Sequence, residues 1–128
     1  MLASGFITTR NIHESWAWVV VIGNGLAGLW ALAANWLPPL RTRELWWFIA
    51  IAESTVFVQV ALGAVLVVRY KVPLPEFHAF YGFVGIIAVA IIYSYRFQMK
   101  HRLYLLYGFG SLFVMGLGIR AMLIATAR

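Results

Sequence analysis

Two histidines stand where two long apolar stretches of the sequence begin. His13 opens the first stretch and His78 opens the third. In a chain that crosses a membrane in alternating directions, odd-numbered spans start from the same side, so both imidazoles should lie at one membrane face and at similar depth. A bis-histidine haem needs two neutral imidazoles from different helices at one level. The sequence therefore makes His13 and His78 candidate ligands of a haem iron.

Three uncharged or acidic polar residues interrupt the apolar stretches, and each needs a physical reason to be there. Asn24 has glycines on both sides, which favours a close helix contact bridged by its amide, and Gln59 fits the same role. Glu53 is either a neutral carboxylic acid bonded to a neighbouring helix or a proton or cation site. Glu53 and Gln59 are six residues apart and point about 120° apart on a helix, so they should not form one site.

Charged residues near the expected histidine face are further candidates. Arg120 either snorkels to the lipid headgroups or clamps an anion, such as a haem propionate. Glu14 and Glu76 lie close to the histidines in sequence and could fix an imidazole tautomer. No catalytic residue is identified, although these two glutamates are the candidates. His101, between two basic residues, is expected to be a solvated loop residue at the opposite face.

The composition defines the elements that must position these residues. The 128-residue chain is 63% hydrophobic and only 11% charged, which indicates an integral membrane protein. A spanning helix needs about 20 apolar residues, and four segments qualify, at about residues 15–36, 45–68, 77–95 and 103–124. Short connections predict an all-α, antiparallel, up-down four-helix bundle, with residues 1–128 forming one domain.

Charge and cysteine content exclude several classes of protein. There is no cysteine, so disulfides and thiolate metal sites are excluded. The net charge of +6 is scattered at helix ends, which suits lipid headgroups and not nucleic acid. Basic residues are almost evenly divided between the two membrane faces. The densest cluster, over residues 96–102, lies between the third and fourth expected spans. It favours a cytoplasmic location for that loop and for the loop between the first and second spans. We therefore expect both termini at the outer face of a prokaryotic plasma membrane.

One stretch resembles a known family. The sequence Gln59-Val60-Ala61-Leu62-Gly63-Ala64, followed by a proline-bearing loop and then His78, resembles one four-helix half of the haem A synthases. In that family a histidine, a Q-x-x-L-G helix and a second histidine follow in this order, and the resemblance implies that His13 and His78 are axial ligands of one haem. The family has eight spans, often a cysteine pair, and a glutamate before the first histidine, whereas Glu14 follows His13. The resemblance therefore supports haem binding more than haem oxidation.

Three functions remain open from the sequence. The first is a membrane haem protein, most simply a b-type cytochrome or a protein of haem synthesis or handling, with electron transfer as its default chemistry. The second is a non-catalytic accessory subunit of a larger, respiratory-type membrane complex. The third is a small dimeric transporter, which is less favoured because such carriers place a glutamate in the first span and the expected span 15–36 has none. A homodimer is compatible with the first reading too, and whether the protein is an enzyme stays open.

Overall fold

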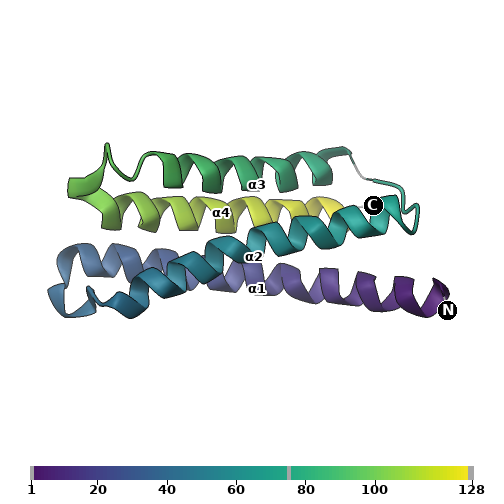
Figure 1. Ribbon diagram of the computed structural model, residues 1–128, viewed down its shortest axis with the longest axis horizontal. Coiled ribbons are helices and arrows are strands. Elements are labelled where there is room, and N and C mark those ends of the chain that lie inside the picture. The colour runs from purple at the N-terminus through teal and green to yellow at the C-terminus, as the bar shows by residue number, and fades with distance from the viewer. Residues whose placement is uncertain (1, 75, 127–128) are drawn as a thin grey trace.

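The computed structural model describes residues 2–74 and 76–126 and contains four long helices in the described chain. They are α1 (Leu2–Trp36), α2 (Arg43–Val68), α3 (Glu76–Ser94) and α4 (Leu103–Thr126), with two short 3-10 helices, η1 (Pro38–Leu40) and η2 (Lys100–Arg102), in the loops. The helices run alternately up and down, so the α2–α3 loop and both ends of the chain lie at the same end of the bundle (Figure 1). The predicted all-α, antiparallel four-helix bundle is confirmed.

The start of α1 is the largest difference from the sequence-based expectation. The helix begins at Leu2, not near Ser15, so His13 lies inside the helix and not at its beginning. No proline interrupts this early segment, and it packs against Tyr70 in the turn that follows α2. The ring of Phe6 lies 5.8 Å from that of Tyr70, and a Cβ at Gly5 would lie 2.7 Å from the Tyr70 hydroxyl. The length of the apolar run in the sequence does not predict these tertiary contacts.

All four helices are long and apolar enough to cross a membrane. Their outward surfaces carry large apolar side chains that are more than half exposed, among them Trp18, Leu29, Ile51, Phe83 and Phe113. Such surfaces suit contact with lipid. The 35 residues of α1 extend over about 52 Å, whereas the hydrocarbon core is about 30 Å thick, so α1 must tilt or project beyond it. The chain is accordingly an integral membrane protein.

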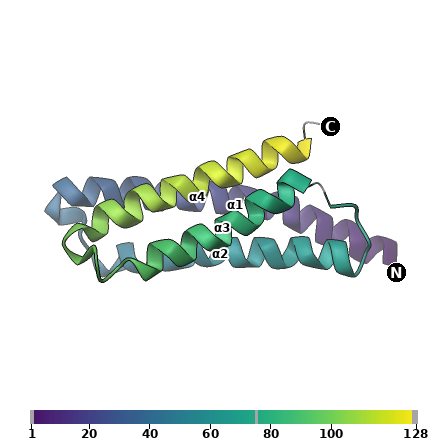
Figure 2. The same cartoon turned by 90° about the horizontal axis from the view of Figure 1, so that it is seen from above.

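Helix α1 holds the bundle together. It packs along α2 and along α4, and α3 packs against α4, while α2 and α3 make much less contact with each other. Figure 2 shows the same arrangement from above, with α3 and α4 side by side and with α2 and α4 farther apart toward the end that carries the termini. The weak α2–α3 contact leaves space inside that end of the bundle.

Two glycines allow a close contact between α1 and α4. A Cβ at Gly28 of α1 would lie 2.9 Å from the carbonyl oxygen of Gly108 and 2.7 Å from the side chain of Leu112 on α4. A Cβ at Gly108 would lie 3.1 Å from the backbone nitrogen of Leu32. Small residues let two backbones approach in a membrane, where packing replaces the hydrophobic effect as the force between helices.

We expect Gly28→Ala to lower the free energy of unfolding by about 1–3 kcal/mol, the usual result of overpacking. The matched control is Gly116→Ala on the same helix pair, because in the described part of the chain no heavy atom lies within 4 Å of a Cβ there. Unfolding in mixed detergent micelles measures both. Equal stability of the two variants would contradict the close α1–α4 contact.

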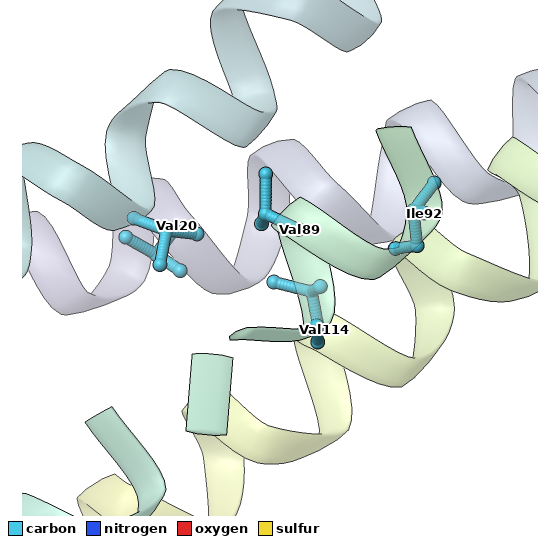
Figure 3. Packing of buried hydrophobic residues seen from close by; sticks show 6 residues of the cluster. Val20, Val89, Ile92 and Val114 are labelled. Carbon is cyan, nitrogen blue, oxygen red and sulfur yellow. The ribbon is translucent and has the colours of Figure 1, made fainter. Parts of the chain in front are cut away.

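Most of the buried apolar residues form two clusters along the bundle. The first comprises Val20, Val56, Ala88, Val89, Ile92 and Val114; Figure 3 shows valines from α1, α3 and α4 of this cluster converging. The second comprises Ala27, Ala31, Ala34, Leu45, Ile49 and Ala52, and lies toward the α1–α2 loop. Its alanines keep α1 and α2 close together. The first cluster closes the inner end of the space described next.

Candidate functional site

A cavity of about 820 Å³ occupies the end of the bundle that carries the chain termini, and all four helices line it. This volume falls within the roughly 300–1,000 Å³ typical of ligand-binding sites. Most of its lining is apolar. The side chains that bring polar groups to it are Arg10, His13, Glu14, Trp18, Gln59, His78 and Tyr81. An apolar cavity with a few convergent polar groups is the usual form of a cofactor site.

The two candidate histidines lie together in this cavity. The centres of the His13 and His78 rings are 6.0 Å apart, and their planes are at 80° to each other. His13 is the twelfth residue of α1, and His78 is the third residue of α3. The antiparallel fold thus brings to one level two residues that are far apart in the sequence.

A backbone hydrogen bond fixes the orientation of His78. Its Nδ1 lies 3.0 Å from the carbonyl oxygen of Ala121 on α4. Since a carbonyl only accepts, Nδ1 must carry the ring proton of the neutral imidazole, and the lone pair is then on Nε2. Histidines that bind metals usually have their second nitrogen bonded in this way.

Helix α2 supports His13 through two residues of the Q-x-x-L-G sequence. Gln59 donates from Nε2 to the backbone carbonyl of His13 at 2.8 Å. Gly63, one turn further along α2, leaves room for the ring, because a Cβ there would lie 3.3 Å from Cε1 of His13. The buried Nδ1 of His13 and Oε1 of Gln59 have no hydrogen-bond partner among the described residues.

The charged candidates divide between the cavity and the outside. Arg10 and Glu14 both line the cavity and form an ion pair at 3.9 Å between exposed side chains, and such pairs contribute little stability. The side chain of Arg120 is exposed and, in the part of the chain the structure describes, does not line the cavity. Glu76 begins α3, but its side chain lies outside the described residues. His101 is exposed at the opposite end, in η2.

The remaining polar residues lie deeper than the cavity. Asn24 donates from Nδ2 to the carbonyl of Ala52 at 3.2 Å, which bridges α1 and α2. Glu53 accepts a hydrogen bond from Ser111 of α4 at 2.8 Å. Gln59 lines the cavity, whereas Glu53 is not among its described lining residues, so the two belong to different places in the bundle.

The side chains present restrict the metal chemistry. Among the side chains that the structure describes, which do not include that of Glu76, no three from His, Cys, Asp or Glu gather to hold a metal ion. Two imidazoles alone make an incomplete shell for a zinc ion, which takes four ligands. A cofactor that brings its own ligands fits a pair of histidines better.

In a comparison with known proteins, no family model, no curated protein and no solved structure matches the chain.

Sequence reasoning missed three contributors to these sites. Arg10 was not among the candidate site residues, because the first helix was expected to begin after it. The carbonyl of Ala121 could not be found, since a backbone acceptor has no sequence signal. Ser111 was missed because serine is ordinary in a membrane helix, and its role depends on facing Glu53.

Proposed function

We propose that this chain is a membrane haem protein that binds one haem b between His13 and His78. The observation that carries the proposal is the pair of imidazoles whose centres lie 6.0 Å apart within a cavity of about 820 Å³. An imidazole–metal bond is roughly 2 Å, so two axial nitrogens on one iron are about 4 Å apart and their ring centres roughly 6 Å apart. The observed separation agrees with that requirement.

The remainder of the cavity also fits this cofactor. Its walls are mainly valine, alanine, glycine and leucine residues, which suit a flat apolar macrocycle. The porphyrin brings four ring nitrogens of its own, so two histidines complete the iron coordination. The resemblance of Gln59–Ala64 to the haem A synthases supports the same proposal, because Gln59 and Gly63 both contact His13.

A haem held by His13 and His78 would supply electron transfer. The chain's own residues hold and insulate it. The Ala121 carbonyl orients His78, and Gln59 anchors the backbone of His13. Apolar walls exclude water and raise the strength of the electrostatic interactions that tune a reduction potential.

Adding ferric haem b to the purified apoprotein in detergent tests the proposal. We expect saturation at one haem per chain, with a sharp Soret band and resolved α and β bands after reduction. A chain that serves only as an accessory subunit would leave haem in the detergent, with a spectrum unchanged from protein-free micelles.

The structure places one glutamate on the first helix, but this residue does not support the transporter alternative. Because α1 begins at Leu2, Glu14 lies on the first helix after all, which corrects the expectation that this helix holds no glutamate. Its side chain is 67% exposed and paired with Arg10. An exposed, paired carboxylate is not the buried group on which a proton-coupled carrier depends.

We expect Arg10→Gln to weaken haem retention several-fold, because Arg10 lines the cavity and can pair with a carboxylate of the cofactor. Arg120→Gln is the matched comparison: if Arg120 is the clamp, this variant should lose more haem than Arg10→Gln. The rate of haem transfer to excess apomyoglobin measures both. Equal rates in Arg10→Gln and wild type would remove Arg10 from the site.

A further inference from the structure

A carboxyl group is buried in the middle of the bundle, away from the histidine cavity. Glu53 of α2 is 8% exposed. Its Oε1 accepts a hydrogen bond from Ser111 Oγ of α4 at 2.8 Å. Its Oε2 is also buried and, among the described residues, receives no hydrogen bond. One oxygen of this carboxyl group therefore has a hydrogen-bond partner, and the other has none among the described residues.

A second buried acceptor without a donor lies at the contact between α1 and α2. Asn24 is fully buried, and its Nδ2 donates to the carbonyls of Val20 at 2.9 Å and Ala52 at 3.2 Å. Because both partners are acceptors, the amide cannot be flipped without losing both bonds. Asn24 Oδ1 is left buried, and no described residue donates to it. Ala52 directly precedes Glu53, and both Asn24 Oδ1 and Glu53 Oε2 are buried acceptors to which no described residue donates.

No described side chain provides a counter-charge for Glu53. The ion pair that the described residues form is Arg10 with Glu14, at the end of the bundle that carries the termini. An ionised carboxylate that is buried without a cation or a full set of donors is strongly unfavourable in a membrane. A proton removes the charge and supplies the missing donor in one step.

We infer that Glu53 is a proton-binding site in the membrane interior, occupied at neutral pH. The proton is on Oε2, the oxygen without a donor. Oε1 is then the carbonyl oxygen of the acid and accepts from Ser111. The hydroxyl at Oε2 then makes a donor of the oxygen that has no partner among the described residues.

The proton site and the histidine cavity are separate but adjacent. Val20, Val56 and Val114 line the inner end of the cavity and belong to the first buried cluster. Each lies about one helical turn from Asn24, Glu53 or Ser111, respectively, along its own helix. These valines separate the two sites, so the inference does not depend on haem binding.

Infrared difference spectroscopy of the apoprotein in detergent at neutral pH tests the inference. The chain has only four acidic residues, Glu14, Glu44, Glu53 and Glu76, so the carboxyl background is small. We expect Glu53→Gln to remove the C=O stretching band of a protonated acid and to leave the carboxylate bands unchanged. Glu44→Gln, at an exposed position, should remove carboxylate intensity and leave the acid band.

Ser111→Ala provides the second readout and keeps the test valid if Glu53→Gln does not fold. Loss of the hydrogen bond to Oε1 should shift the acid band to higher frequency without removing it. An acid band at unchanged frequency would overturn the assignment of the proton to Oε2. Carboxylate loss in Glu53→Gln, with no change in the acid region, would mean that Glu53 is ionised beside a cation or water, and would overturn the inference.

Discussion

Replacing His78 with alanine should abolish the bis-histidine haem spectrum while the protein remains folded in the membrane. The variant removes one of the two imidazoles that face each other across the cavity. Loss of groups that merely support a metal ligand weakens metal binding by about 10–100-fold, so loss of the ligand itself should weaken haem binding by at least about 100-fold. Haem titration followed by optical absorption measures this change.

The chain provides a matched control in its third histidine. His101 is exposed in η2, at the opposite end of the bundle. His101→Ala should bind haem like the wild type, and His13→Ala should behave like His78→Ala. If His78→Ala and wild type had the same affinity and spectrum, His78 would not be a ligand.

Gly63→Leu should eliminate bis-histidine binding without touching either histidine. A Cβ at Gly63 already lies 3.3 Å from Cε1 of His13, so a longer side chain takes the place of the ring. His13 then turns away from its partner, and haem bound by His78 alone should show a high-spin spectrum. Gly63→Ala should give an intermediate result, because a methyl group requires a shift of only a few tenths of an ångström.

Gly116→Leu controls for the cost of inserting a leucine. Position 116 is exposed on α4, and a Cβ there meets no described heavy atom within 4 Å. We expect it to keep the wild-type spectrum, and circular dichroism should show the same helix content in all of these variants. A low-spin spectrum in Gly63→Leu would show that His13 does not depend on the space beside Gly63.

The apolar runs predicted the fold well because membrane helices must satisfy their backbone hydrogen bonds internally and span a fixed thickness. Helices α2, α3 and α4 begin and end close to the expected residues. The start of α1 differed because contacts such as Phe6 with Tyr70 continue the helix where hydropathy fades. Such contacts depend on the folded arrangement and leave no periodic signal.

Position along the chain was enough to suggest that His13 and His78 share one membrane face, because alternating spans repeat their direction. It could not give the direction in which each ring points. That depends on the Ala121 carbonyl beside His78 and on the space at Gly63 beside His13. The expectation that Arg120 contacts the site has the same limit. The sequence allows an estimate of the depth of Arg120 in the membrane, but not of the face of α4 on which its side chain lies.

Electron paramagnetic resonance of the ferric, haem-loaded protein tests most directly whether His13 and His78 bind one iron. Their ring planes are at 80°, and near-perpendicular imidazole planes leave two iron d orbitals almost equal in energy. We therefore expect a low-spin signal with one very large g value, and its loss in both His13→Ala and His78→Ala. A purely high-spin signal from the wild-type protein, or a low-spin signal that persists in either variant, would contradict the proposed site.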